Sequence, residues 1–415
     1  MTARNVLRRT LLQIVPACWL GPAIAATSMV PVSVAPPPVL VRDRLQIGVA
    51  THYGMRGESI KTFNALAAMG MDGLRDEAYW DHVESPPGTF NIPKQVATWY
   101  ELARRSSLQP LLLLSYTHPA YQNGARPTTA AGRDGFVRYT AFVARALPGV
   151  RQFQIWNEWE LVSKFGEPGL AENYLSLVRE VAPVLRAERP GALILPAGVH
   201  RAGFFNGYLE SLVRGGLLGM VDGIALHTYR FSESDPSPEA WYAEMRRLGE
   251  LIAVWDPHRG PSAALYVTEM GFPSHRGLHG VTPTLQADYL ERCLLLALLV
   301  PRLRGFWWYG LRDKGQIPWE SEHHYGLLEP DGIPKPSSVR LQGLMGRLRR
   351  ASRVELISQQ AECWAVQLEA ADGSVWLAKW SPAADRSAAG THAELGQRPV
   401  WSLLRAPALF KGARR

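Results

Sequence analysis

The sequence predicts an α/β fold, a (β/α)8 TIM barrel with a small C-terminal β appendage. Between about residues 44 and 345, short apolar runs alternate with amphipathic stretches whose apolar residues recur at helical spacing. Eight strand candidates fall within this segment, whose length is close to the roughly 250 residues of such a barrel before insertions. Beyond it, short alternating strands predict a β-rich subdomain over residues 346–415.

The barrel strands are predicted from short, mostly apolar runs. They are residues 45–50, 73–76, 110–115, 152–156, 192–197, 223–227, 265–268 and 306–309. The helices between them are predicted at residues 59–69, 92–105, 135–146, 170–188, 203–214, 238–255 and 283–299. An open, doubly wound sheet is the rival fold, but no glycine-rich phosphate loop follows any of these strands.

The appendage is predicted from three further strands. They are residues 353–357, 362–369 and 374–380. Asp372-Gly373 suits a hairpin turn between the last two, and strands from residues 30–43 could join the same sheet. A carbohydrate-binding module is the alternative, but Trp364 and Trp376 are more typical of a core than of a sugar platform. We therefore expect the appendage to pack on the barrel.

The first 25 residues resemble an export signal. Arg4, Arg8 and Arg9 form a basic start, residues 11–24 are largely apolar, and the small residues at 23–25 fit a cleavage site. These features predict a periplasmic or secreted protein.

Two other interpretations of the N-terminal region are open. Arg8-Arg9 also resembles a twin-arginine signal, which would imply export after folding. Cys18 completes a partial lipobox, so a lipid anchor at Cys18 is a third alternative. Residues 26–43 are proline-rich and predict an extended lead-in to the barrel. No later segment has the roughly 18 uncharged apolar residues that a membrane span needs.

Charge and cysteine content exclude some classes of partner. The formal net charge of +8 falls to +5 without the three signal arginines, and no lysine-rich run or basic helix appears. Nucleic acid is therefore not a predicted partner. Cys293 and Cys363 lie in different predicted elements without metal-ligand spacing. They could pair in an oxidising compartment, although two buried thiols are the simpler interpretation.

Two of the predicted barrel strands end in a glutamate. Residues 150–156 lead into Asn157-Glu158, and residues 264–268 lead into Glu269. In a parallel barrel, the reacting groups lie where the strands end. Counting strands places the two glutamates on the fourth and seventh strands, which face one another across the barrel mouth. Hydrolysis of a glycosidic bond needs such a pair of carboxyl groups, so Glu158 and Glu269 are the candidate catalytic residues.

Other polar and aromatic residues at strand ends are candidates for substrate binding. They are His52, Arg75, Trp80, His118, Asn157, His227, Tyr229 and Trp308. Arg75 could hold Glu269 ionised. Tyr229 could donate a hydrogen bond to Glu269, because it lies on the same strand face as His227. Only one of Trp307 and Trp308 can face the barrel interior, and we predict Trp308.

Two further groups of residues are predicted to take no part in catalysis. Glu160 is expected to be solvated or paired. His323 and His324 lack a third ligand, so they predict the edge of a substrate cleft and no metal site.

The segments around both glutamates resemble clan A retaining glycoside hydrolases. These segments are IWNE at 155–158 and VTEMGFPS at 267–274. In that clan the Asn-Glu glutamate is the acid/base and the later glutamate is the nucleophile. Within the clan, the chain most resembles family 39, especially its bacterial exopolysaccharide endoglycosidases. Three segments carry this resemblance: GLRDEAYWDHVESPPGTFN at 73–91, FWWYGLRDKG at 306–315 and HHYGLLEPDGIPKP at 323–336.

This resemblance implies a retaining mechanism, no cofactor or metal, and an extended glycan substrate. Trp159 departs from it, since many relatives have proline there, and a bulky indole is expected to reshape the leaving-group side. The sequence thus predicts an exported, monomeric retaining β-glycosidase, endo-acting on a bacterial exopolysaccharide. A transglycosylase and a catalytically inactive glycan-binding protein are the alternatives.

Overall fold

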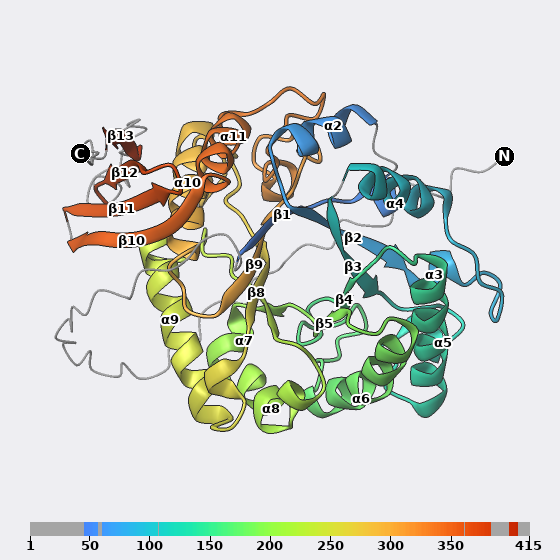
Figure 1. Cartoon of the computed structure of the whole chain (residues 1–415). Helices are drawn as coiled ribbons and strands as arrows, with labels where there is room; N and C mark the ends of the chain where they lie inside the picture. Colours follow the sequence, from blue (N-terminus) through green and yellow to red (C-terminus); the bar gives the residue numbers. More distant parts are fainter. Residues whose placement is uncertain (1–44, 57–59, 107, 361, 383–397, 406–415) are drawn as a thin grey trace, which may run out of the picture. The chain divides into compact units, whose positions relative to one another are not determined.

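Nine parallel strands form the wall of the predicted barrel (Figure 1). They are β1 (Gln46–Ala50), β2 (Gly73–Tyr79), β3 (Gln109–Ser115), β4 (Gln152–Ile155), β5 (Leu193–Leu195), β6 (Val199–His200), β7 (Ile224–His227), β8 (Leu265–Met270) and β9 (Leu303–Tyr309). Their order is β5-β4-β3-β2-β1-β9-β8-β7-β6. β5 lies within the predicted fifth strand at 192–197, and β6 continues its direction after Pro196, a residue without a backbone donor, beyond the predicted bounds. The nine strands are therefore the eight strands of a (β/α)8 TIM barrel.

This structure is a computed structural model that describes residues 45–56, 60–106, 108–360, 362–382 and 398–405. The predicted signal at 1–25, with Cys18, and the lead-in at 26–43 lie outside the described residues. Within them, no helix is both long enough and apolar enough to cross a membrane.

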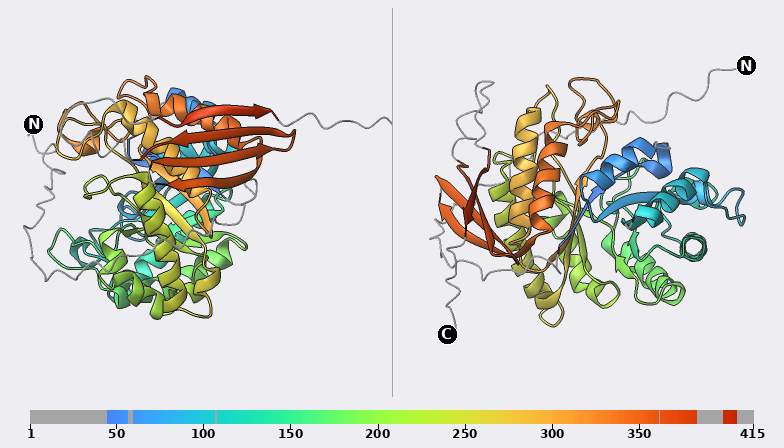
Figure 2. Two further views of the ribbon diagram at one scale, coloured as in Figure 1. Left: turned by 90° about the vertical axis from the view of Figure 1, so that its left-hand side faces the viewer. Right: turned by 45° about the horizontal axis from the view of Figure 1, so that its top comes forward.

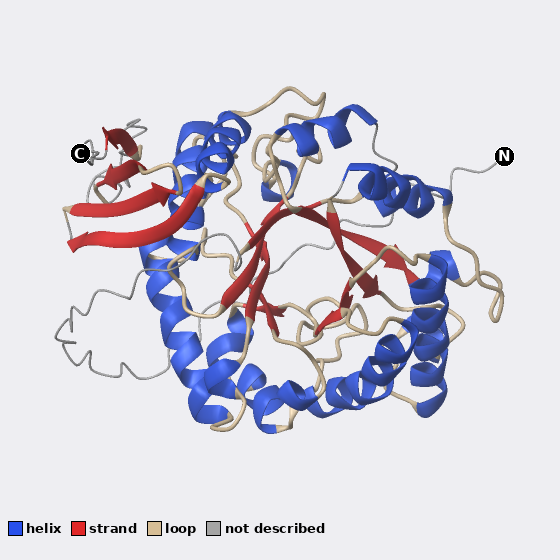
Figure 3. Cartoon of the chain, in the orientation of Figure 1, coloured by secondary structure: helices blue, strands red, loops and turns tan. Residues whose placement is uncertain are grey.

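Helices surround the strands, as Figures 2 and 3 show. They are α1 (Tyr53–Arg56), α2 (Ile60–Ala68), α3 (Trp80–Val83), α4 (Lys94–Ser106), α5 (Ala130–Ala146), α6 (Ala171–Glu188), α7 (Ala202–Phe205), α8 (Tyr208–Arg214), α9 (Pro238–Trp255), α10 (Pro283–Ala297) and α11 (Pro336–Leu348). The chain sets several of these boundaries locally. Ser237 and Thr282 cap α9 and α10 with their side chains, and each is followed by a proline at the first helical position.

One correction concerns the filling of the barrel. A separate apolar cluster lies inside the strands, formed by Leu111, Leu195, Ala225, Tyr266 and Trp307. The neighbouring strand leaves room for this indole at Gly48, where a Cβ would approach Trp307 to 2.4 Å. Strand alternation then turns Trp308 outward against Phe272, so the prediction that Trp308 faces the interior is wrong.

The appendage is a four-stranded antiparallel sheet. Its strands are β10 (Ala351–Gln360), β11 (Cys363–Ala370), β12 (Ser374–Trp380) and β13 (Val400–Arg405), of which β13 was not predicted. The proposed strands from residues 30–43 lie outside the described residues. Trp364 and Trp376 are buried, which confirms their prediction as core residues. Cys293 and Cys363 are both free thiols, the first buried and the second half-buried.

Two indoles attach this sheet to α9 and α10. Trp380 Nε1 donates to Glu239 Oε1 of α9 at 2.6 Å, and Trp401 Nε1 donates to Glu291 Oε1 of α10 at 2.7 Å. Glu239 also pairs with Arg292, a fully buried cation. The expectation that the appendage packs on the barrel is confirmed.

Candidate active site

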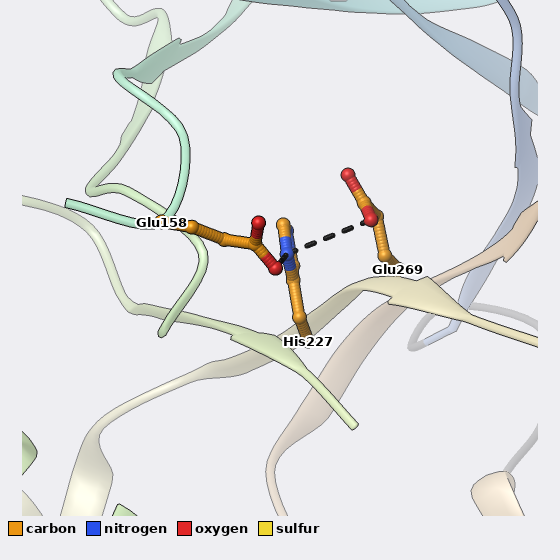
Figure 4. Close-up of side chains that lie close together, drawn as sticks. All are labelled: Glu158, His227 and Glu269. Atoms are coloured by element: carbon orange, nitrogen blue, oxygen red, sulfur yellow. Dashed lines mark hydrogen bonds and ion pairs between the residues drawn. The ribbon is translucent and has the colours of Figure 1, made fainter. Parts of the chain in front are cut away.

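Glu158 and Glu269 face one another at the carboxyl ends of the barrel strands (Figure 4). Glu269 lies in β8, and Glu158 follows β4. His227, the last residue of β7, projects between them. Its Nδ1 lies 2.9 Å from Glu158 Oε1 and 3.6 Å from Glu269 Oε2. One oxygen of each glutamate and a ring nitrogen of His227 all lie within 4.8 Å of one another, so the fold brings the predicted pair together.

The backbone after β4 is shaped to present Glu158. Trp156 and Glu158 have φ of 72° and 45°, in the left-handed region that side chains other than glycine rarely adopt. Trp156 packs against Phe136 and Trp159, which holds this turn in place. Trp159 is buried and its Nε1 donates to Leu170 O at 3.2 Å. The indole therefore packs into the fold, and its expected effect on the leaving-group side stays a prediction.

Glu269 is surrounded by donors. Arg75 Nη1 donates to Oε1 and the Tyr229 hydroxyl donates to Oε2, both at 2.7 Å, so the predicted contacts of these two residues with Glu269 are confirmed. Burial alone would raise the pKa of Glu269, but electrostatic interactions with His227 and Arg75 and the hydrogen bond from Tyr229 outweigh it and lower this pKa to about 2. Glu269 is thus ionised at neutral pH.

Arg75 is itself held by two side-chain amides, one within β4 and one just after the end of β4. Its Nε donates to Gln154 Oε1 at 2.7 Å, and its Nη2 donates to Asn157 Oδ1 at 2.8 Å. Asn157 also donates to Glu158 Oε2 at 3.4 Å, so one chain of hydrogen bonds joins both glutamates. Gln154 was not predicted. The available signal was its position, since polar and apolar residues alternate along β4 and Gln154 lies on the polar face.

Substitution of Arg75 is expected to shift the acid limb of the pH–rate profile. Without the cation, burial is opposed less strongly and the pKa of Glu269 rises, so more of this carboxyl is protonated at low pH and the limb moves to higher pH. Arg75→Met should shift it more than Arg75→Lys, which keeps the charge but not the planar fork. The measurement is kcat/KM against pH with an aryl glycoside. An unmoved limb in both variants would remove Arg75 from this role.

His52 lies at the margin of this site. Its Nδ1 is 2.8 Å from Glu77 Oε1, and its ring lies edge-on to Tyr309, with centroids 6.0 Å apart. Tyr309 in turn contacts the ring of Tyr229. Glu77, two residues before the end of β2, was not among the predicted site residues. Substrate binding by His52 stays a prediction.

Three predicted sugar contacts are buried side chains and are corrected here. Trp80 is fully buried and donates to Glu84 Oε2 at 2.5 Å. His118 is buried with Nε2 2.8 Å from Glu84 O, while Nδ1 accepts from Ala120 N at 3.1 Å. Trp308 is buried and donates to Tyr325 O at 3.0 Å. Their polar atoms are satisfied within the protein, so these residues pack the structure and do not reach a bound sugar.

Glu160 faces away from the pair, into the fold. Its Oε1 accepts a hydrogen bond from the backbone N–H of His200, whereas its Oε2 is buried without a partner. Burial raises the pKa of Glu160 to about 7. Glu160 is therefore paired through one oxygen, as expected, and is not solvated through the other.

The side chains at the site can be compared with the ligands that a metal ion would need. Among the described residues, Glu158, His227 and Glu269 form the one cluster with ligand spacing. Both oxygens of Glu269, however, already accept hydrogen bonds, from Arg75 and from Tyr229, and the positive charge of Arg75 beside Oε1 opposes a bound cation. The donor set therefore fits a hydrogen-bonded site better than a metal centre. His323 and His324 instead hydrogen-bond to Ile317 within their loop.

Gly198→Ala is expected to lower kcat/KM about 100-fold, because the new methyl group would displace His227. A Cβ at Gly198 would lie 2.0 Å from His227 Nε2, and His227 is fully buried with no space to retreat. The measurement is turnover of an aryl glycoside, with circular dichroism to verify folding. Gly346→Ala is the matched control, since its Cβ would meet no atom within 4 Å. A fully active, folded Gly198→Ala would contradict the importance of His227.

The fold is similar to those of solved glycoside hydrolases. A family 39 glycoside hydrolase from the gut symbiont Bacteroides cellulosilyticus WH2 is 22% identical, with a TM-score of 0.69 over 83% of this chain and 72% of that one. A GH5_18 protein from Streptomyces cattleya in complex with GlcNAc is 18% identical, with a TM-score of 0.60 over 74% of this chain and 81% of that one. A glucosidase from Croceicoccus marinus is 14% identical, with a TM-score of 0.61 over 83% of this chain and 76% of that one.

No protein-family model and no curated protein matches this sequence. The solved structures agree with the resemblance found in the strand-end segments. The chain thus has the TIM-barrel fold of clan A glycoside hydrolases, and its fold is similar to that of a family 39 enzyme.

Proposed function

We propose that this protein is a retaining β-glycosidase, with Glu158 as acid/base and Glu269 as nucleophile. The observation that carries the proposal is the pair of strand-end carboxylates with oxygens within 4.8 Å of one another. Inverting enzymes need a separation of about 6.5–9.5 Å to admit a water, whereas retaining pairs lie about 5–5.5 Å apart. An oxygen of one carboxyl group within 4.8 Å of an oxygen of the other fits the retaining class, in which one of the two glutamates attacks directly.

The environments of the two carboxyl groups assign the roles. Glu269 is ionised through its neighbours and can attack the anomeric carbon. Glu158 is more exposed and lies beside His227, so it can protonate the leaving oxygen. A glycosyl ester then forms on Glu269, and the leaving sugar departs with the proton of Glu158. In the second step Glu158 takes a proton from water, which displaces Glu269 and restores the original anomer.

The substrate proposal is an extended bacterial exopolysaccharide cut internally. It is supported by the resemblance of segments 73–91 and 306–336 to exopolysaccharide endoglycosidases. The family 39 structure with a similar fold is consistent with it.

The test is incubation with a panel of β-linked bacterial and plant polysaccharides, reading product size and the anomer of fresh product. We expect short oligosaccharides of retained configuration from one polymer. Products longer than the starting chains would identify a transglycosylase instead. Binding of a polymer without new reducing ends would identify an inactive glycan-binding protein, and either result would overturn the hydrolase proposal.

Export is proposed from the features of residues 1–25. N-terminal sequencing of the exported protein should find a start near Ala26. A lipid-modified start at Cys18 would identify the lipoprotein alternative, and an unprocessed chain inside the cell would contradict export.

A further inference from the structure

The loop between β9 and α11 presents a tryptophan to solvent. Trp319 is 72% exposed and is the one exposed tryptophan among the described residues. Ile317 beside it is 45% exposed, and Leu278 on the preceding β8–α10 loop is 83% exposed. A large indole left in water together with other apolar side chains is typical of a binding surface.

The backbone that carries this tryptophan is hydrogen-bonded from both sides. Arg276 N, in the β8–α10 loop, donates to Pro318 O at 2.6 Å. Ile317 N donates to His323 Nδ1 at 3.2 Å, and His324 Nε2 lies 2.8 Å from Ile317 O. The backbone next to the exposed indole is therefore held at a defined place, which lowers the entropy lost when a ligand orders this loop.

The same loop forms part of the wall behind Glu269. Glu322, three residues after the exposed tryptophan, accepts from the Tyr309 hydroxyl at 3.1 Å and from Lys314 Nζ at 2.6 Å. Tyr309 contacts the ring of Tyr229, which donates to Glu269. Trp319 is thus connected to the nucleophile through one loop and two tyrosines.

The strand order indicates on which side of the scissile bond the β9–α11 loop lies. β9 lies four places from β4 in the barrel, directly opposite the strand that carries Glu158. Glu158 protonates the oxygen of the leaving group, so the opposite side of the mouth holds the part of the glycan that remains on the enzyme. The β9–α11 loop therefore lies on the glycone side.

We propose that Trp319 is a platform for a distal glycone sugar, one beyond the ring that Glu269 attacks. This rests on the proposed glycosidase function. The C–H face of a pyranose can cover the indole, and the neighbouring Lys314 and Glu322 can bond its hydroxyl groups. A sugar bound there requires a chain that continues past the attacked ring, so the enzyme does not remove single sugars from the non-reducing end of the polymer.

The experiment compares two substrates: the panel polysaccharide that the wild-type enzyme shortens, and the p-nitrophenyl glycoside of its sugar. Trp319→Ala should lower kcat/KM about tenfold on the polymer and leave the aryl glycoside unchanged. Trp319→Phe should recover part of the loss, since it keeps an aromatic face. Val254→Ala is the matched control, because Val254 is also exposed, at 65%, but lies in the last turn of α9. It should behave as wild type on both substrates.

Three outcomes would overturn the platform. Trp319→Ala could equal the wild type on the polymer, or it could lose activity equally on both substrates, as a structural role would require. A wild-type dimer that Trp319→Ala dissociates would show that a second protein copy covers the indole. If the wild type shortens no polymer at all, the proposed function itself fails.

Discussion

Glu269→Gly is expected to be inactive, with a loss on the order of 10⁴-fold or more, and to be partly rescued by azide. Glu269 is the ionised carboxylate held by Arg75 and Tyr229, so no other group replaces it as nucleophile. Azide fits the vacated space and attacks the anomeric carbon from the face that Glu269 normally occupies. The adduct should therefore have the inverted configuration, which nuclear magnetic resonance of fresh product measures.

The wild-type enzyme supplies the complementary measurement. A slow fluorinated glycoside of the cleaved sugar should trap an ester, and mass spectrometry should find it on the peptide that carries Glu269. Glu160→Gly is a control that removes a nearby carboxylate facing the backbone of His200. It should show no azide adduct. A label on Glu158 or Glu160, or an inverted product from the wild-type enzyme, would contradict the assignment.

Glu158→Gln should lose activity in proportion to how poor the leaving group is. General acid catalysis contributes about 10²–10⁴-fold, and that share is needed only when the leaving oxygen requires a proton. Glycosidic bonds in the polymer should therefore be cleaved about 10²–10⁴-fold more slowly. An activated aryl glycoside should be affected much less in its first step, as stopped-flow release of the phenol would show.

Glu160→Gln is the matched control for this leaving-group test. It makes the same chemical change two residues further on, at a carboxyl group that does not contact His227. Its dependence on the leaving group should match that of the wild type. Equal losses on both substrate types for Glu158→Gln would remove Glu158 as the acid.

The barrel strands were predictable because each is a short apolar run followed by a helical pattern, and the glutamates were predictable because each ends such a run. The fifth strand shows the limit. Residues 192–197 were predicted as one strand, yet β5 ends at Leu195, before Pro196, and the ladder resumes beyond the predicted bounds as β6. Sequence periodicity identifies the run of apolar residues but does not show where a missing backbone donor divides it.

The side chains around the glutamates were harder to predict. Arg75 lies on β2, where the alternation of faces determines its direction, and Tyr229 follows the end of β7 by two residues, so it keeps the side of the strand on which His227 lies. Trp80 and His118 lie beyond strand ends, where the chain turns and strand counting no longer gives a direction. The choice between Trp307 and Trp308 depended on Gly48 in a neighbouring strand, a pairing that a single sequence does not reveal.

The indoles that join the C-terminal sheet to the barrel bear on the ancestry of the chain. Trp380 completes the hydrogen bonding of Glu239, which holds the fully buried Arg292. A barrel recombined with an unrelated C-terminal partner would leave this ion pair short of a donor and open to water. We therefore expect the two parts to be inherited together and to diverge in concert, unlike a sugar-binding cassette that is exchanged freely between enzymes.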